Sequence, residues 1–276
     1  KFISQSRELP DGFVVDMILK APSPNIMNKL ARSVLALYSY DDYAEEKGIE
    51  SEMHTAISII AKLPVIMTAA YQVKKSHYCN ESMVMHPLNP EENTAQTILS
   101  MLRTDRAYTE AEAQLLDVLL ILHAEHGGGN NSTFACRVLT SSGTDAYSAY
   151  SAAIGSLKGH RHGGANIKVM QMLEDFKANV KDWNSDGQVA DHMRKVLRKE
   201  ANDFSGLIYG MGHAVYTLSD PREKILRDKA AALAKGTEIE AEFKLLETIE
   251  RLTPELFAEV RGEKRVICSN VDMYSG

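Results

Sequence analysis

Histidine and glycine concentrate in three stretches of the chain, and these residue types are suited to binding and polarising an anionic substrate. The stretches are residues 123–132, 158–166 and 206–213, with the sequences HAEHGGGNNS, KGHRHGGAN and GLIYGMGH. Imidazoles donate hydrogen bonds to carbonyl or carboxylate oxygens near neutral pH. Glycines let the backbone approach a ligand closely, and helix N-termini present unpaired N–H groups. The three stretches predict a small polyanionic substrate held among helix ends.

Two other ligand classes fit these stretches less well. His123 and His126 resemble a metal-binding pair, but the order His-Glu-x-x-His of metalloproteases is absent, which favours a hydrogen-bonded His123 at a helix end over zinc. No predicted strand precedes the glycines, and the phosphate-binding pattern Gly-x-x-x-x-Gly-Lys-Ser/Thr is missing. A histidine-rich metal-binding protein stays an alternative that elemental analysis would test.

Helical patterns dominate the rest of the chain, so the predicted fold class is all-α. Ser23-Pro24 predicts a helix start, and Thr109 with Glu112 forms a capping-box pattern before another helix. Asp145 is expected to cap a helix that runs to Leu157. Further helices are predicted at residues 53–71, 166–180, 188–200, 222–234 and 237–260.

Three local features predict where these helices begin, are interrupted or give way to extended backbone. Pro64 is expected to kink or break the helix that contains it, and Thr253-Pro254 is expected to interrupt the last one. Asp220-Pro221 predicts a cap and first turn for the helix at 222–234. Residues 265–268 are expected to form a short extended piece.

Composition limits the possible partners and compartments. The 276 residues are 44% hydrophobic and 25% charged, with a formal net charge of −6 and no basic block that would predict nucleic-acid binding. No apolar run approaches the ~20 residues that span a bilayer, so no membrane partner is expected. The three cysteines form no disulfide framework, which favours a reducing compartment, with the bacterial cytoplasm as the expected location.

The order of these motifs resembles the citrate synthase family. The resemblance covers most of the chain, and most clearly residues 109–276. Its first block runs from His126 through the sequence AIGSLKG at 153–159 to Asn166, and its second is GHAVY at 212–216 followed by DPR at 220–222. The chain ends in NVDMYSG at 270–276, which looks like a third motif of that family.

The resemblance implies a reaction and a role for each matching residue. The family condenses acetyl-CoA with oxaloacetate through an enol or enolate and then hydrolyses citryl-CoA. Asp272 matches the base that removes a methyl proton, and His162 matches the donor to the thioester oxygen. Ser132 matches a position that orients this imidazole, and His213 matches the histidine that polarises the keto carbonyl.

Three further residues match substrate ligands of the family. His126 and Arg222 correspond to oxaloacetate ligands, and Asn130 is expected nearby. Arginine is suited to this role because its guanidinium binds a carboxylate with two hydrogen bonds. Outside the family, Arg222 would be read as pairing with Asp220 or Glu223 on its own helix, and Asp272 as a cap or turn residue. No cofactor or metal is implied, and acetyl-CoA is a cosubstrate.

The resemblance also implies an architecture. The expected fold has a large helical domain at 1–161 and a small one at 162–276 that carries the catalytic histidine and aspartate, with the active site in the cleft between them. A homodimer is expected. Compared with the family, the C-terminal helices and part of the N-terminal region are missing, and arginines that bind oxaloacetate are missing with them, so weak oxaloacetate binding is expected.

Three alternatives to a citrate synthase stay open at this point. The first is a 2-methylcitrate synthase that uses propionyl-CoA, because one methylene changes selectivity by only ~1–3 kcal/mol. The second, of another class, is a catalytically inactive helical binding or assembly module. Truncation would favour this second alternative, in which the chain is inactive. The third is the histidine-rich metal-binding protein.

Overall fold

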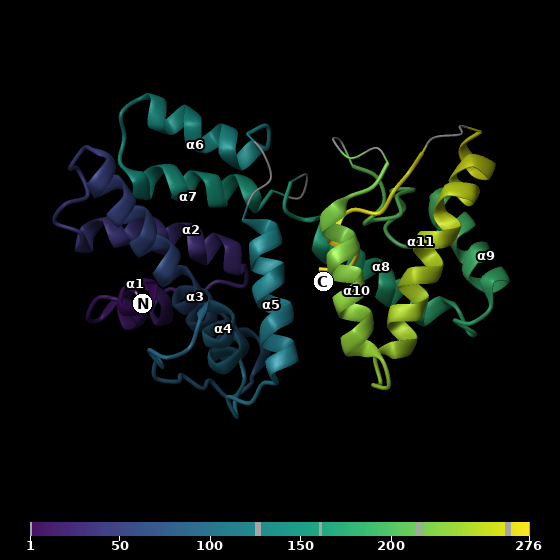
Figure 1. The fold of residues 1–276 in the computed structure, drawn as a ribbon, viewed down its shortest axis with the longest axis horizontal. Coiled ribbons are helices and arrows are strands. Elements are labelled where there is room, and N and C mark those ends of the chain that lie inside the picture. Colours follow the sequence, from purple (N-terminus) through teal and green to yellow (C-terminus); the bar gives the residue numbers. More distant parts are fainter. Residues whose placement is uncertain are drawn as a thin grey trace. The chain divides into compact units, whose positions relative to one another are not determined.

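A computed structural model describes residues 2–124, 128–159, 162–213, 216, 218–262 and 266–275. The described residues form helices joined by loops, and they divide into two compact units, 1–162 and 163–276 (Figure 1). The predicted boundary between residues 161 and 162 lies one residue before the division between these units.

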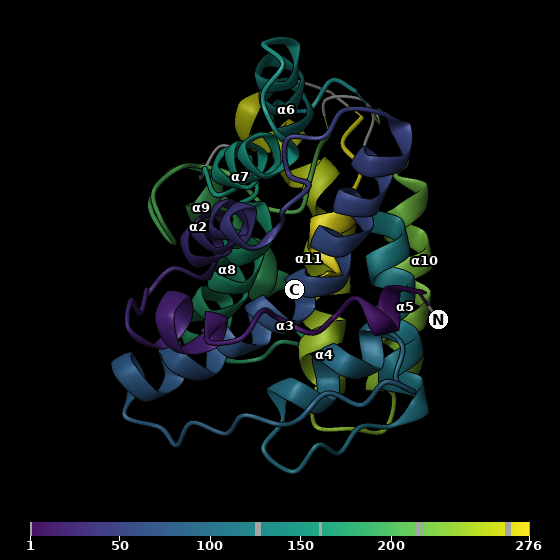
Figure 2. The same cartoon turned by 90° about the vertical axis from the view of Figure 1, so that its left-hand side faces the viewer.

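The first unit is a stack of helices around one apolar core. Its elements are α1 (Phe2–Gln5), the π-helix η1 (Val14–Leu19), α2 (Ile26–Leu37), the short 3-10 helix η2 (Tyr38–Tyr40), α3 (Ile49–Cys79), α4 (Thr94–Leu102), α5 (Glu110–His123), α6 (Asn131–Ser141) and α7 (Ala146–Leu157). Helix α7 lies beside both α2 and α6 (Figure 2). Phe13, Ile18, Val34 and Ile66 are fully buried where η1, α2 and α3 meet.

Two of the predicted helix starts in this unit are confirmed. Thr109 caps α5 in a capping box, since its hydroxyl accepts from the Glu112 N–H at 3.2 Å and the Glu112 carboxylate accepts from the Thr109 N–H at 2.7 Å. Asp145 caps α7, which ends at Leu157 as predicted. The start at Ser23-Pro24 is wrong: Asn25 caps α2, because the Ser23 hydroxyl instead bonds the backbone of Asn25.

Helix α3 runs through Pro64 without a break, so the predicted interruption is wrong. A proline inside a helix costs about 3 kcal/mol. Pro64 is buried, and Ile59 and Ile66 on either side of it pack into the core, which offsets that cost. Helix α3 is long and apolar enough to cross a membrane by length and composition alone. However, 56% of its most apolar 18-residue segment is buried within the protein, as in a core helix.

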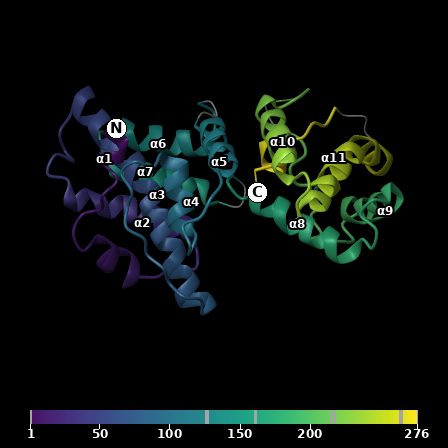
Figure 3. The same cartoon turned by 60° about the horizontal axis from the view of Figure 1, so that its bottom comes forward.

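The second unit packs four helices and a short terminal turn. They are α8 (Ala165–Asn179), α9 (Asp186–Leu197), α10 (Pro221–Ala234), α11 (Glu240–Arg261) and the 3-10 turn η3 (Val271–Met273). Helix α9 lies along α11 (Figure 3), and Met172, Met193 and Ile249 are fully buried. The predicted cap at Asp220 and first turn at Pro221 are confirmed for α10.

One detail of this unit differs from the sequence-based expectation. The interruption at Pro254 is wrong, because α11 continues to Arg261 with Leu256 buried beyond the proline. Of the predicted extended piece, residues 266–268 are described and lie outside any helix or strand. The adjoining Ser269 makes an antiparallel bridge with Met211.

Candidate active site

In the first unit, the start of α6 holds an imidazole. Asn130 caps α6 by accepting a hydrogen bond from the Thr133 N–H at 2.9 Å, which places Ser132 in the first turn. The Ser132 hydroxyl lies 2.8 Å from Nε2 of His162, thirty residues further along the chain. The backbone of His162 is held by the Gly159 carbonyl at 2.9 Å. His126, the other histidine predicted here, lies outside the described residues.

The Ser132 contact fixes the position of the His162 ring. A serine hydroxyl can donate or accept, so the contact is compatible with either tautomer of the neutral imidazole. In the tautomer in which the hydroxyl donates to Nε2, the ring proton lies on Nδ1 and Nδ1–H can act as a hydrogen-bond donor. The contact between Ser132 and His162 predicted from the sequence is therefore present, and it orients the imidazole.

Replacing Ser132 by alanine is expected to lower kcat about 10- to 100-fold. The imidazole would keep its chemistry but lose the partner that fixes its orientation, and misplacement of a reacting group by about 1 Å costs up to 10²-fold. For the reaction that the family resemblance implies, the measurement is steady-state CoA release, with the exposed Ser141→Ala as the control variant. Wild-type kcat in a folded Ser132→Ala protein would contradict the orienting role.

In the second unit, two loops lie side by side and bring two predicted residues into one region. The Gly212 N–H donates to the Cys268 carbonyl at 2.7 Å, and the Asn270 N–H donates to the Gly210 carbonyl at 2.9 Å. The Asn270 side chain also donates to the Gly212 carbonyl at 2.6 Å. His213 directly follows the first loop, and Asp272 lies two residues after Asn270.

Gly210 is required for this close approach. Its φ is +81°, a conformation that favours glycine. A Cβ atom at this position would lie 2.7 Å from the Met273 sulfur and 3.0 Å from the Met273 Cα. A side chain at residue 210 would therefore push away the turn that carries Asp272.

His213 is held in one tautomer by its own loop. The Tyr216 N–H donates to Nδ1 of His213 at 3.1 Å, and a backbone N–H can only donate, so Nδ1 is the acceptor. In the neutral ring the proton is then on Nε2. His213 therefore presents an Nε2–H donor, which is the form needed to polarise a carbonyl oxygen.

Arg222 and Asp220 form a buried pair at the start of α10. Asp220 is fully buried and accepts from Nε and Nη2 of Arg222 at 3.0 and 2.8 Å. Burial opposes the ionisation of Asp220, but the hydrogen bonds from Arg222 hold its pKa below the usual range. The same hydrogen bonds raise the pKa of Arg222, and the nearby charge of Asp272 adds to that effect. The guanidinium also lies 5.3 Å from the centre of the Tyr216 ring.

Asp272 stands on a turn that is fixed from several directions. Its N–H donates to the Asn270 side chain at 3.0 Å, and the preceding Val271 N–H donates to Asp220 at 3.1 Å. Val271 and Met273 are buried, whereas Asp272 is half-buried. The carboxylate is therefore carried on a rigid turn and keeps access to a ligand.

The second unit thus brings together three of the predicted residues: His213 and Arg222 both contact Tyr216, and Asp220 joins Arg222 to the turn of Asp272. Tyr216 ends the motif at 212–216, and the family resemblance does not by itself indicate this role. Within the described residues no group of three His, Cys, Asp or Glu side chains is placed to hold a metal ion.

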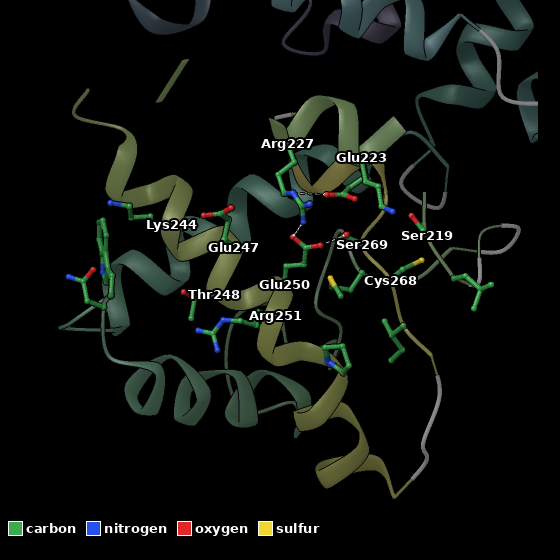
Figure 4. A pocket seen from close by; sticks show the side chains of 17 residues that line it. Ser219, Glu223, Arg227, Lys244, Glu247, Thr248, Glu250, Arg251, Cys268 and Ser269 are labelled. Carbon is green, nitrogen blue, oxygen red and sulfur yellow. Dashed lines mark hydrogen bonds and ion pairs between the residues drawn. The ribbon is translucent and has the colours of Figure 1, made fainter. Parts of the chain in front are cut away.

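A cluster that no sequence motif indicated lies beside this region. Glu223 of α10 and Glu250 of α11 face a cavity of about 740 Å³ in the second unit, with Arg227 and Ser269 beside them (Figure 4). Burial, and then the charge of Glu250, raise the pKa of Glu223 to about 7. The two glutamates are 27 positions apart on different helices, so no local pattern could have paired them.

Glu223 is expected to make stability depend on pH around neutrality. Its folded-state pKa of about 7 lies above the usual value of about 4.3 in the unfolded chain, so the folded state retains a proton that the unfolded state loses. The free energy of unfolding should therefore fall as pH rises from about 4.5 to 7. Glu223→Gln should lose that slope and become about 2–3 kcal/mol more stable than wild type at pH 8.

Urea unfolding of both proteins at pH 5 and pH 8 is the measurement. The facing groups Glu250, Arg227 and Asp220 are the same in both proteins, so their own contributions largely cancel in the comparison. Equal pH slopes for wild type and Glu223→Gln would contradict the assignment.

Comparison with known proteins agrees with the motifs. A family model described as "Citrate synthase, C-terminal domain" matches residues 1–276. Citrate synthase of Haloferax volcanii is 33% identical over 99% of this chain and 66% of its own length. Citrate/2-methylcitrate synthase of Bacillus subtilis is 29% identical over 91% of the chain and 62% of its own length.

Solved structures share the fold. Citrate synthase from Pyrobaculum aerophilum matches with a TM-score of 0.77 and 26% identity, over 99% of this chain and 65% of that one. Citrate synthase from Thermoplasma acidophilum, solved in a ternary complex with carboxymethyl coenzyme A and oxaloacetate, matches with a TM-score of 0.76 and 22% identity, over 99% of this chain and 66% of that one. The likeness at 22% identity shows the fold alone.

The chain belongs to the citrate synthase family, and it has that family's all-helical fold. It spans about two-thirds of the length of the relatives it matches. The predicted family and fold class are thereby confirmed.

Proposed function

We propose that the protein condenses acetyl-CoA with oxaloacetate to give citrate and CoA. The observation that carries the proposal is the arrangement around Tyr216: an imidazole with an Nε2–H donor, a guanidinium, and a carboxylate on the turn tied to that guanidinium through Asp220. A donor, a cation and a base are the groups that an aldol-type addition to an anionic keto acid needs. Membership of the family supports the same reading.

Each residue has a defined task in the proposed reaction. The Arg222 guanidinium binds a carboxylate of oxaloacetate, and Nε2–H of His213 donates to the keto oxygen. Asp272 removes a proton from the acetyl methyl group, while His162 donates to the thioester oxygen as negative charge develops there. The methylene carbon then attacks the keto carbon, the keto oxygen gains a proton, and water hydrolyses the citryl thioester to release CoA. His126 and Asn130 are proposed as further oxaloacetate ligands.

The test is oxaloacetate-dependent release of free CoA from acetyl-CoA, followed with a thiol reagent. Release that requires both substrates is the expected result. No release from the folded protein with either acetyl-CoA or propionyl-CoA would overturn the proposal, and the inactive binding or assembly module would take its place. The activity of this chain should be compared with that of the protein at its full encoded length, because the chain spans two-thirds of its relatives.

Propionyl-CoA is the second candidate acyl donor. A relative from Bacillus subtilis is described as a citrate/2-methylcitrate synthase, and both reactions use the same groups. The extra methylene of propionyl-CoA changes binding by only about 1–3 kcal/mol, so the ratio of kcat/KM for the two donors decides between them. A ratio above about ten in favour of propionyl-CoA would make 2-methylcitrate the product.

We also propose that the protein is a homodimer of the cytoplasm. Exposed apolar side chains on α5 and α6 support an interface there: Ile121 is 64% exposed, Phe134 67% and Val138 49%. Helix α6 buries none of its described side chains within the protein, although it is amphipathic. Light scattering of wild type and Phe134→Glu tests the dimer, which the charge should dissociate.

A further inference from the structure

We propose that Glu250 is a positioning residue for Asp272, acting as a clamp on the turn that carries this base. The inference rests on the proposed function, in which Asp272 removes the methyl proton. The Glu250 carboxylate accepts from the Ser269 hydroxyl with one oxygen and from the Tyr274 hydroxyl with the other, each at 2.5 Å. Ser269 lies three residues before Asp272, and Tyr274 lies two residues after it.

The geometry makes one side chain hold both ends of the turn. Hydrogen bonds from hydroxyls to a carboxylate are short and about twice as strong as bonds between neutral groups. The turn between the two anchors contains Asn270, Val271 and Met273, whose backbone N–H groups also donate hydrogen bonds, to the Gly210 carbonyl, the Asp220 side chain and the Asn270 carbonyl. Loss of Glu250 would therefore loosen the position of Asp272 without removing every attachment of the turn.

The clamp stands on a rigid part of the second unit. Glu250 follows Ile249 on α11, and both Ile249 and Leu245 are fully buried. Tyr274 is also buried, and its pKa is raised by burial and by the charge of Glu250, so its hydroxyl keeps the proton that it donates. A helix packed in the core thus transmits its fixed position to the turn of the catalytic base.

Two ionisable groups of a neighbouring helix lie close to Glu250. Arg227 of α10 approaches the oxygen that binds Tyr274 at 3.6 Å. Glu223, also on α10, is 3% exposed, and one of its carboxyl oxygens has no hydrogen-bond partner among the described residues. Ionisation of Glu223 opposes the charge of Glu250, so the proton on Glu223 favours the clamp. Figure 4 shows Glu223, Arg227, Glu250 and Ser269 facing one another.

The first arm of the test measures the rate of proton removal. Glu250→Gln removes the charge and one acceptor, so kcat should fall about 10- to 100-fold, as expected for a reacting group misplaced by about 1 Å. KM for oxaloacetate should stay within about twofold, because Arg222 and His213 are untouched. The kinetic isotope effect with acetyl-CoA deuterated at the methyl group should rise, since a misplaced base makes proton removal more rate-limiting.

The isotope effect separates positioning from folding. A smaller folded fraction lowers the apparent kcat but leaves the isotope effect unchanged. Glu247→Gln is the matched control, because Glu247 is on the same helix and lines the same cavity. Tyr274→Phe removes one hydroxyl only and decides the question if Glu250→Gln does not fold.

A double-variant cycle tests whether Glu250 acts through Tyr274. If both belong to one clamp, Glu250→Gln/Tyr274→Phe should have a kcat within about threefold of the slower single variant. Losses that multiply, or a Glu250→Gln protein with wild-type kcat and isotope effect, would overturn the proposal.

A second arm does not depend on activity. Amide hydrogen exchange of residues 271–274 should be at least about tenfold faster in Glu250→Gln than in wild type, with Glu247→Gln unchanged. If wild-type protein releases no CoA but exchange is faster in Glu250→Gln, the proposed reaction is overturned, and the clamp is supported as a structural feature only. Unchanged amide exchange of residues 271–274 in Glu250→Gln would overturn the clamp, whatever the measured activity.

Discussion

Replacing Asp272 by asparagine is expected to lower kcat for CoA release about 10²- to 10⁴-fold. The amide has the shape of the carboxylate but cannot take the methyl proton, and a general base contributes an acceleration of that size. Two attachments of the turn are unchanged by this substitution, because the Asn270 side chain still accepts from the N–H of residue 272 and Asp220 still accepts from the Val271 N–H.

The measurement is steady-state CoA release at saturating acetyl-CoA and oxaloacetate. Asp228→Asn is the matched control: it makes the same change at an exposed position of α10 in the same unit. Calorimetric titration should show that Asp272→Asn still binds oxaloacetate. A variant that keeps more than a tenth of the wild-type kcat would remove Asp272 from the role of base.

Local rules predicted the elements that end or begin at a polar cap. The Thr109 and Glu112 pattern and the Asp220-Pro221 pattern each depend on residues within three positions, and the structure has both. The interruptions at Pro64 and Pro254 were wrong for the opposite reason. Burial of distant side chains around each proline outweighs the local cost, and that burial has no signature within the helix itself.

The candidate site also has parts that the sequence predicted and parts that it did not. His213 and Asp272 were predicted because they match positions of short motifs that resemble the family. What fixes them was not found: the Tyr216 N–H that sets the His213 tautomer, and the Glu250 side chain that bonds Ser269 and Tyr274. These supports are backbone groups or single residues on separate elements, so only the folded chain identifies them.

Asp220 shows how a local reading can be correct and still incomplete. The sequence predicts a helix cap, and the side chain does accept from the Arg222 N–H at 3.0 Å. It also accepts from the Arg222 guanidinium twice and from the Val271 N–H at 3.1 Å. One fully buried carboxylate therefore joins the helix start, the candidate substrate cation and the turn of the candidate base.

Asp220→Asn is accordingly expected to lower the free energy of unfolding by about 3–5 kcal/mol at pH 7. Breaking a buried ion pair from one side leaves an uncompensated charge, and the Arg222 side chain is only 12% exposed. The pKa of Asp220 is depressed in the folded state, so its contribution is present above the ordinary aspartate pKa of about 3.9 and is lost as pH falls through the lower folded value. The difference between wild type and variant should therefore shrink below about pH 4.

Urea unfolding of Asp220→Asn, Arg222→Gln and the double variant separates the ion pair from the cap. Removing both charges should restore part of the lost stability, because no unpaired guanidinium remains. Activity should not return with stability, since the double variant lacks the cation proposed to bind oxaloacetate. A double variant less stable than Asp220→Asn would show that Arg222 stabilises the fold by itself, and a loss below about 1 kcal/mol in Asp220→Asn would show that the pair contributes little to stability.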